Sequence, residues 1–471
     1  MTDPSAIAAA VKLIFPVGQA ISKPFGPLTK AAYSNLQQAL YNATQKYREK
    51  YCERHGELKV LGMSRPASLD DIYVKVRLLD RNSIRMFESL DKIEETFRTA
   101  KQRSFGQKDC VTKPGYEVAN GEQYLMVLGG PGAGKSTFLR KMGMETLKFT
   151  QEEGFHHECV PVFVELKRFK ELPIDIESHI SDEFETCGFP KPKEFTQAAL
   201  KQGKLLVLLD GLDEVPTANR SEAVKQIQDF VDRYSKNRFI ASCRIAAYNQ
   251  NFRRFTDVGV AEFDDEQIRD FIDNWFGKES NRSNDCWEEV TKADSVGVKE
   301  LAQTPLLLTL VCLLFEKGGE LPVRRATLYD RALRVLLEEW NASKELERDK
   351  PYKGLDTRAK ELLLATIAFD FFEDDRLFFP RRELASTIET VLKEEILPDE
   401  KRVDGNVVLR TIEVQHGILA ERSTDIYSFS HLTLQEFLAA VQISDNPSKY
   451  LKRAIKNHLF DERWKEVFLL L

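Results

Sequence analysis

YLMVLGGPGAGKST, residues Tyr124 to Thr137, is the stretch that decides the fold of this chain. Its first part is a run of apolar residues that is typical of a buried strand. A glycine-rich turn follows, ends in Lys135 and Ser136, and leads into apolar residues at helical spacing. The spacing of Gly129, four further residues, and then Gly134, Lys135 and Ser136 is the pattern of a phosphate-binding loop (P-loop) between a strand and a helix.

Each position of this loop has a physical role. Glycines let the backbone turn its N–H groups toward an anion without a Cβ in the way. Lys135 supplies a positive charge for the β- and γ-phosphates, Ser136 offers a hydroxyl to Mg²⁺, and the helix directs its positive dipole end at the same anion. An ordinary glycine-rich turn is the alternative, and the strand-like and helix-like flanks argue against it. We therefore predict a site for ATP or ADP with Mg²⁺, formed by Gly129, Gly130, Pro131, Gly132, Ala133, Gly134, Lys135, Ser136 and Thr137.

A second stretch, LLVLLDGLDEV at 205–215, ends a strand in acidic residues. Five consecutive apolar residues predict a strand that is buried on both faces, as in a parallel sheet. The strand ends at Asp210, where P-loop folds hold an aspartate that binds Mg²⁺ opposite the loop hydroxyl. Asp210 and Ser136 are therefore the predicted Mg²⁺ ligands. The alternative is a strand that ends in a surface turn with incidental acids.

Strands and helices continue to alternate beyond the loop. Further strands are expected at VPVFVEL (160–166), RFIASC (238–243) and VGVAEF (258–263), and Pro161 restricts the first of them to a strand start or a sheet edge. Arg244 follows the second, and ligands of open α/β sheets bind at the carboxyl ends of strands. We expect Arg244 to meet the γ-phosphate, with a surface ion pair as the alternative. The predicted fold class is an α/β P-loop NTPase with a parallel sheet and flanking helices.

Composition describes a multidomain globular protein. At 471 residues the chain exceeds one compact core, and its 42% hydrophobic and 30% charged residues argue against disorder. The net charge of −6 gives no global reason to expect nucleic acid as the main partner. Seven cysteines are scattered without a CxxC pair, so neither a disulfide framework nor a zinc site is indicated. This pattern suits a reducing, cytoplasmic location.

The rest of the chain is predicted to be mostly helical. Asp264 and Gln267 form a capping-box pattern that begins a helix, and Ile418–Glu421 and Ile426–Phe429 flank a Ser-Thr-Asp turn that predicts a β-hairpin wing. The predicted domains are an amino-terminal helical domain (1–60), a linker strand and helix (61–115), the nucleotide-binding domain (116–263), a helical domain (264–350), a winged-helix domain (351–445) and the start of a further helical or sensor region that is cut short (446–471).

An apolar stretch from Ala6 to Ile21 lies near the amino terminus. Lys12, Pro16 and Gly18 interrupt it, so it is too short and broken for a spanning helix. A helix buried against its own domain is favoured over a membrane-active amphipathic segment. The second interpretation leaves a contact between this helix and a membrane open.

Four motifs occur in order along the chain: GGPGAGKST (129–137), DGLDE (210–214), TPLLLTLVCLLF (304–315) and FSHLTLQEFLAA (429–440). In this order they resemble the NACHT family of signal-transduction ATPases, the nucleotide switches of NOD-like immune receptors. In DGLDE a small residue follows the Mg²⁺ aspartate, whereas general AAA+ motors have glutamate there. The segment YREKYCERHGELKVLGM (47–63) is similar to helical domains that precede NACHT modules in bacterial defence proteins.

The resemblance implies roles for residues far from the loop. Pro305 would lie against the adenine, and His431 would contact the β-phosphate of ADP in a closed state. Ile72 and Tyr73, in a strand-like segment, would pack on the adenine. Each residue has a plainer alternative, namely a helix-start proline, a capping or core histidine, and ordinary core packing.

The resemblance also implies a slow ATPase that works as a switch. Asp213 or Glu214 would position or deprotonate the attacking water, and Arg244 would stabilise charge on the γ-phosphate. A protein or nucleic-acid trigger would release the closed ADP form, and ATP-bound chains would form homo-oligomers. In a bacterial member the output would be defence against phage through the amino-terminal helical effector. The alternatives are an AAA+-like ATP-driven remodeller and a nucleotide-regulated winged-helix transcription factor.

Overall fold

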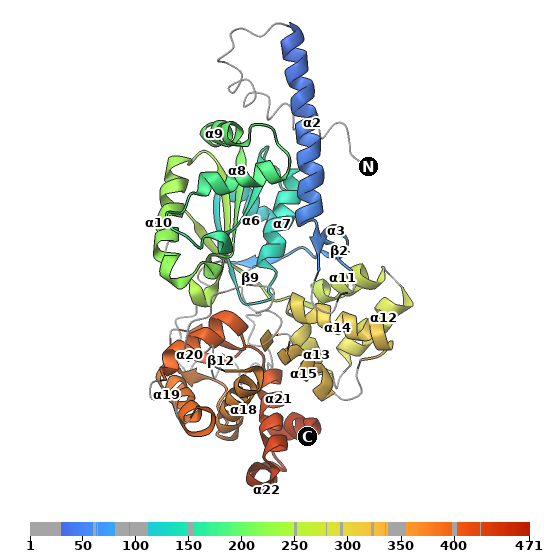
Figure 1. Cartoon of the computed structure of the whole chain (residues 1–471). Helices are drawn as coiled ribbons and strands as arrows, with labels where there is room; N and C mark the ends of the chain where they lie inside the picture. The colour runs from blue at the N-terminus through green and yellow to red at the C-terminus, as the bar shows by residue number, and fades with distance from the viewer. Residues whose placement is uncertain are drawn as a thin grey trace.

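The computed structural model describes residues 30–59, 63, 65–80, 94, 112–148, 154–248, 252–278, 280–292, 295–321, 325–334, 336–337, 355–397, 403–423 and 425–471. Its shape is elongated: helix α2 (Lys30–His55) stands at one end, an α/β domain follows, and two mostly helical regions form the other end (Figure 1). The apolar stretch at 6–21 lies outside the described residues. None of the helices described is long and apolar enough to cross a membrane.

The α/β domain is built on a seven-stranded sheet with the order β4-β3-β9-β5-β8-β7-β6. Its parallel strands are β5 (Tyr124–Gly129), β6 (Val160–Glu165), β7 (Leu205–Asp210), β8 (Arg238–Arg244) and β9 (Thr256–Val260). The strands β3 (Arg77–Leu79) and β4 (Thr112–Pro114) extend it antiparallel beyond β9. The sheet is therefore mixed, and the P-loop strand β5 lies inside its parallel part.

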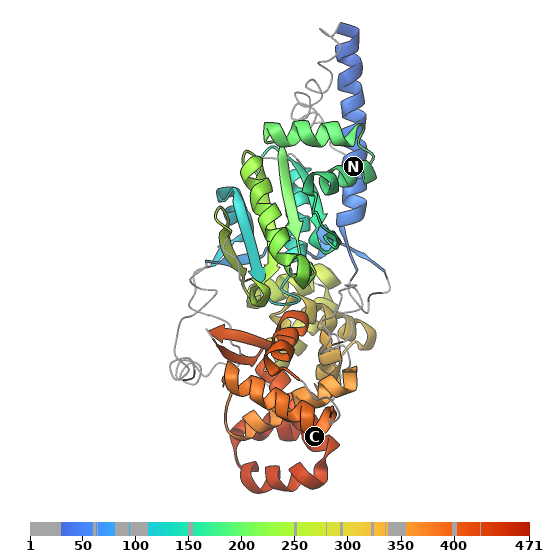
Figure 2. The same cartoon turned by 60° about the vertical axis from the view of Figure 1, so that its left-hand side comes forward.

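The burial of the sheet follows the sequence pattern. Leu205 to Leu209 are all fully buried, as expected for a strand that is covered on both faces. Pro161 lies in β6, which is an edge strand of this sheet, as predicted. The helices that flank the sheet (Figure 2) are α6 (Gly115–Gly121), α7 (Lys135–Thr146), α8 (Ile176–Thr186), α9 (Pro192–Gln202) and α10 (Thr217–Arg233), with short turns η2 (Leu166–Arg168), η3 (Leu212–Glu214) and η4 (Ile245–Ala247).

The last parallel strand begins and ends earlier than predicted. The expected strand at 258–263 is found at Thr256–Val260, because pairing with β5 places Thr256 opposite Leu125. Phe263 lies beyond the sheet, where its N–H donates to the Gln303 carbonyl at 2.9 Å. Its side chain belongs to the core of the helical regions instead.

The expected strand at Ile72 is also corrected. Ile72 ends the short helix α3 (Leu69–Ile72), in which Leu69 and Ile72 are both buried. Acidic residues in the first turn favour this helix start. A small antiparallel ribbon of β1 (Glu57–Leu58) and β2 (Ala67–Ser68) precedes the helix.

The helical domain begins with the predicted capping box, which confirms that helix start. The Asp264 carboxylate accepts from the Gln267 backbone N–H at 2.9 Å, and the Gln267 side-chain oxygen accepts from the Asp264 N–H at 3.2 Å. The helices are α11 (Asp265–Phe276), α12 (Asn281–Thr291), α13 (Val296–Ala302), α14 (Pro305–Gly318) and α15 (Arg325–Arg334).

The winged-helix region shares one hydrophobic core with the helical domain. The predicted hairpin is present as β11 (Leu419–Ser423) and β12 (Ile426–Phe429), and β10 (Phe379–Pro380) pairs with β12 as a third strand. A two-residue strand has no period-2 pattern, so sequence reasoning missed β10. The helices are α18 (Thr357–Glu373), α19 (Arg381–Val391), η6 (Leu392–Ile396), α20 (Gly405–Thr411), η7 (Ile412–His416) and α21 (Leu432–Asp445), followed by α22 (Pro447–His458), η8 (Glu462–Trp464) and α23 (Lys465–Leu470).

The second half of α2 is built into the α/β domain. Tyr47 and Tyr51 are buried in the same hydrophobic core as the sheet. Near the end of the helix, Arg54 donates to the buried carboxylate of Glu183 on α8 at 2.6 Å. The amino-terminal helix is therefore physically joined to the nucleotide-binding domain.

Gly143 of α7 decides how closely α2 approaches, because a Cβ there would lie 2.1 Å from the Tyr51 hydroxyl oxygen and 3.0 Å from Leu208. We expect Gly143→Ala to lower the stability of this domain by about 1–3 kcal/mol through overpacking. Thermal unfolding of the purified chain should show a lower midpoint. Gly318→Ala, at a helical position with open space, is the matched control and should be neutral or stabilising by up to about 1 kcal/mol. Equal midpoints for the two variants would contradict the close packing of α2 on α7.

Candidate functional site

The predicted phosphate-binding loop joins β5 to α7. Gly132 and Gly134 have φ values of +71° and +89°, a region that residues with a Cβ rarely adopt. The loop ends where α7 begins at Lys135, so the first N–H groups of that helix face the loop. The backbone is thus shaped as an anion cradle at a helix amino terminus.

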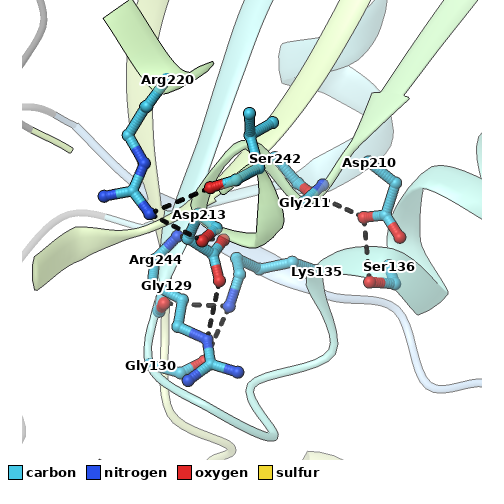
Figure 3. Close-up of polar contacts among 11 residues, drawn as sticks. Gly129, Gly130, Lys135, Ser136, Asp210, Gly211, Asp213, Arg220, Ser242 and Arg244 are labelled. Carbon is cyan, nitrogen blue, oxygen red and sulfur yellow. Dashed lines mark hydrogen bonds and ion pairs between the residues drawn. The ribbon is translucent and has the colours of Figure 1, made fainter. Parts of the chain in front are cut away.

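The Lys135 ammonium group lies inside this loop. Its Nζ donates to the carbonyl oxygens of Gly129 at 2.9 Å and Gly130 at 2.8 Å (Figure 3). Its positive charge is therefore held at the place where the motif puts the β- and γ-phosphates.

The two predicted Mg²⁺ ligands lie in contact. The Ser136 Oγ donates to the Asp210 Oδ1 at 2.9 Å, which brings the start of α7 to the end of β7 (Figure 3). A hydroxyl and one carboxylate fit a Mg²⁺ ion that takes its other ligands from water and nucleotide phosphates. The described residues hold no group of three His, Cys, Asp or Glu side chains suited to a metal bound by protein alone. The site therefore fits a metal that arrives with a nucleotide.

Ser242 is a site residue that sequence reasoning missed. Its Oγ lies 2.6 Å from the Asp210 Oδ1 and accepts from the Gly211 N–H at 2.8 Å. Ser242 is in β8 beside β7, and it is 1% exposed. The available signal was a hydroxyl residue inside an otherwise apolar strand next to the Asp210 strand.

Arg244 and Asp213 form a buried ion pair. The Arg244 Nε lies 2.9 Å from the Asp213 Oδ2, and the Arg244 backbone N–H donates to the Asp213 Oδ1 at 3.0 Å. Burial lowers the pKa of Arg244, and the Asp213 charge opposes this effect. The side chains are only 4% and 5% exposed, so the surface ion pair considered for Arg244 is replaced by a buried one within the site.

Glu214 folds back over the turn that follows Asp210. Its N–H donates to the Gly211 carbonyl at 2.9 Å. Gly211 has a φ of +79°, and a Cβ there would lie 2.9 Å from the Glu214 carboxyl carbon. The small residue in DGLDE is therefore required both by the turn and by the acid above it. Arg220 of α10 supports the same turn, since its Nη2 donates to the Asp213 carbonyl at 3.0 Å.

The helical domain contacts the P-loop through the start of α14. The Leu306 N–H donates to the Gly132 carbonyl at 3.3 Å, and a Cβ on Gly132 would lie 2.7 Å from the Leu306 Cβ. Pro305, the first residue of α14, lies with its Cγ 3.9 Å from the position a Gly134 Cβ would take. Pro305 therefore both begins a helix and lies beside the loop.

The winged-helix region contacts the same loop through Gly417. A Cβ at Gly417 would lie 2.4 Å from the Cγ and Cδ atoms of Pro131, and Gly417 has a φ of +62°. Sequence reasoning missed this residue, because nothing in its local pattern indicates a partner almost three hundred residues earlier.

His431 lies at the junction of the helical and winged-helix regions. Its Nε2 is 3.3 Å from the Thr304 Oγ1, and the residue is 8% exposed. Burial lowers the pKa of His431 to about 3, and the charge of Arg422 adds to this effect. Glu300 of α13 accepts from the Thr433 hydroxyl at 2.6 Å and so ties the first turn of α21 to the helical domain. His431 is therefore neutral at pH 7, and it lies beside Thr304, the residue that precedes Pro305.

Tyr73 contacts residues of α7, α6 and α11. Its ring lies 5.3 Å from the Lys141 Nζ and 6.5 Å from the Tyr116 ring, and its carbonyl accepts from Asn274 of α11 at 3.3 Å. Ile72 is buried beside it. An adenine contact of these two residues stays a prediction.

Comparison with protein-family profiles identifies the family to which these domains belong. The NACHT domain profile matches residues 123–279, and the winged helix-turn-helix domain C-terminal to NACHT matches residues 325–443, so that the two cover more than half of the chain. The chain belongs to the NACHT family. It is thus a signalling P-loop NTPase with a NACHT nucleotide-binding domain and a winged-helix domain.

Three solved structures are among those to which the NACHT chain is similar. A Walker-type ATPase of Pyrococcus abyssi is 12% identical, with a TM-score of 0.39 over 79% of this chain and 99% of its own. The ORC2 protein of Aeropyrum pernix, in ADPNP and ADP complexes, is 12% identical, with a TM-score of 0.35 over 78% and 99%. A STAND protein with a tetratricopeptide repeat sensor from Pyrococcus horikoshii is 14% identical, with a TM-score of 0.28 over 75% and 46%. No curated protein matches the NACHT chain significantly.

The depressed pKa of His431 predicts acid sensitivity of the junction between the helical and winged-helix regions. An exposed histidine takes up a proton near pH 6.5, whereas buried His431 does so only near pH 3. The contribution of neutral His431 to the free energy of unfolding is therefore complete above about pH 6.5. It falls by about 1.4 kcal/mol for each pH unit as the pH drops toward 3. Between pH 7.5 and pH 5.5, the midpoint of thermal unfolding should fall further for the wild type than for His431→Gln. Parallel pH profiles of the two proteins would contradict a buried, neutral His431.

Proposed function

We propose that this NACHT protein is an ATP/ADP-operated switch of innate immunity, with anti-phage defence as its role in a bacterium. One observation carries the proposal: the P-loop is in contact with both other regions, through Leu306 on Gly132 and through Gly417 on Pro131. Nucleotide exchange at this loop changes the surface on which the winged-helix domain rests.

In the proposed resting state the NACHT domain holds ADP under the winged-helix domain. Lys135 binds the phosphates, Pro305 lies against the adenine, and His431 contacts the β-phosphate as a neutral imidazole. The proximity of His431 to Thr304, the residue before Pro305, supports this assignment, because the proposed adenine contact and the proposed β-phosphate contact then lie close together. A protein or nucleic-acid trigger would release the winged-helix domain from the nucleotide.

In the proposed ATP state, bound Mg²⁺ would be held by Ser136 and Asp210 and would neutralise charge on the β- and γ-phosphates. Arg244 would turn its guanidinium group from Asp213 to the γ-phosphate. Asp213, freed from this pair, would accept a proton from the attacking water or position it together with Glu214. Breaking a buried ion pair before each turnover is consistent with slow hydrolysis.

The proposed output is assembly. Shifting a population from about one per cent active to ninety-nine per cent needs roughly 5.5 kcal/mol, which the trigger and the γ-phosphate would share. We propose that active chains form homo-oligomers in the cytoplasm and bring their amino-terminal helices together. Those helices would act as the effector, by oligomerisation or by contact with a membrane.

The transcription-factor alternative has weaker support. A winged helix that reads DNA places its recognition helix in the major groove. In this chain the second helix of the helix-turn-helix is α20 (Gly405–Thr411), which precedes the wing and carries one basic residue, Arg410, so it offers little charge to DNA phosphates. A remodeller, the other alternative, requires continuous substrate-stimulated ATP turnover, and rapid sustained turnover by the monomer alone would favour it over the switch.

Gly417→Ala tests the cover over the P-loop. The added Cβ would overlap Pro131, and overpacking of about 1–3 kcal/mol corresponds to about 5- to 150-fold in an equilibrium. We expect faster release of a fluorescent ADP and oligomerisation at lower trigger or ATP concentration. Gly319→Ala is the matched control, because Gly319 also has positive φ, at +74°, but open space around it. If ADP release is equally slow in both variants, the winged-helix domain does not hold the nucleotide.

Lys135→Ala tests the nucleotide site itself. Removing the loop ammonium should abolish measurable ATP binding and any cell-protective phenotype, because the phosphates lose their charge partner. Lys193→Ala, at an exposed position of α9, removes the same charge away from the site and should leave both unchanged. ATP binding that survives in Lys135→Ala would argue against the proposed switch.

A further inference from the structure

We infer that Ser242 is a positioning residue that orients the Asp210 carboxylate for Mg²⁺. The inference rests on the proposed Mg²⁺-nucleotide site and adds a residue outside its recognised motifs. Ser242 lies in β8, two residues before Arg244, and is buried between the strands that carry the P-loop and Asp210.

The hydrogen bonds fix which way the Ser242 proton points. The Gly211 N–H can only donate, and it reaches the Ser242 Oγ at 2.8 Å, so that bond uses a lone pair of the hydroxyl. The single hydroxyl proton is then left for the Asp210 Oδ1, at 2.6 Å. Ser242 is therefore a donor to the carboxylate, and this charge-assisted bond fixes the rotation of the Asp210 side chain.

The bond from Ser242 differs from the bond that Asp210 receives from Ser136. Ser136 is the second residue of α7, and it would give up its contact with Asp210 on becoming a metal ligand. Ser242 is a buried strand residue that lies opposite Val127 of β5 in the sheet register. Its bond is independent of the ligand, so it would keep Asp210 in place in the empty, ADP and ATP states.

The same bond also supports the turn after Asp210. Gly211 has a φ of +79°. Among the described contacts, its backbone N–H donates to the Ser242 Oγ, so this turn depends on the position of that oxygen. Two residues along β8, Arg244 holds Asp213 in the same way. The strand β8 thus orients both the metal-binding acid and the acid proposed to handle water.

The test separates metal binding from nucleotide binding. The affinity of a fluorescent, non-hydrolysable ATP analogue would be measured with excess Mg²⁺ and with EDTA for the wild type, Ser242→Ala and Ser242→Thr. We expect Ser242→Ala to lose about 10-fold or more in the Mg²⁺-dependent part of the affinity, as outer contacts of metal ligands typically do, with the EDTA value unchanged. Ser242→Thr retains the hydroxyl and should stay near the wild type. The thermal midpoint without nucleotide serves as the check on folding.

Each outcome has a defined meaning. Equal losses in Mg²⁺ and EDTA for Ser242→Ala would show a purely structural role and overturn the inference, and so would a Mg²⁺ dependence that does not change. If Ser242→Ala does not fold, a Ser242→Thr protein that folds but has lost its Mg²⁺ dependence would overturn it, and one that keeps it would support it. A wild type that binds the ATP analogue in neither condition would instead overturn the proposed function, and the inference with it.

Discussion

The rest of the structure depends on one constraint, the close packing of the glycine-rich P-loop against the helical and winged-helix regions. Gly132 and Gly134 leave room for Leu306 and Pro305, and Gly417 leaves room for Pro131. At Gly132 and at Gly417 a single methyl group would force atoms apart. Because closely packed interiors transmit displacement, a change at the loop is felt by the helical and winged-helix regions together.

A second constraint acts from inside the sheet. The strand β8 lies between the strands of the P-loop and of Asp210, and its carboxyl end carries Ser242 and Arg244. These residues hold Asp210 and Asp213. A buried strand therefore orients two acids on either side of the turn at Gly211. Precise orientation of charged groups is what electrostatic catalysis requires.

Much of the fold followed from local patterns. The loop spacing, the apolar run before Asp210, the capping box at Asp264 and the hairpin wing were predicted correctly because each depends on neighbours in the chain. The errors came where distant pairing decided the result, as when the register with β5 placed β9 at Thr256–Val260. The buried partner of Arg244 was missed for the same reason, since spacing places Arg244 at a strand end but does not identify the acid that meets it.

By itself, the sequence determined that this protein has a P-loop, an aspartate at the end of a buried strand, and the motifs of a NACHT protein. Backbone shape, periodicity and capping are local properties, so residue type and spacing specify them. Only the tertiary structure decided that Ser242 holds Asp210, that Gly417 rests on Pro131, and that α2 is part of the α/β core. These contacts join residues far apart in the chain, and their formation depends on the packing of whole elements rather than on any spacing along the sequence.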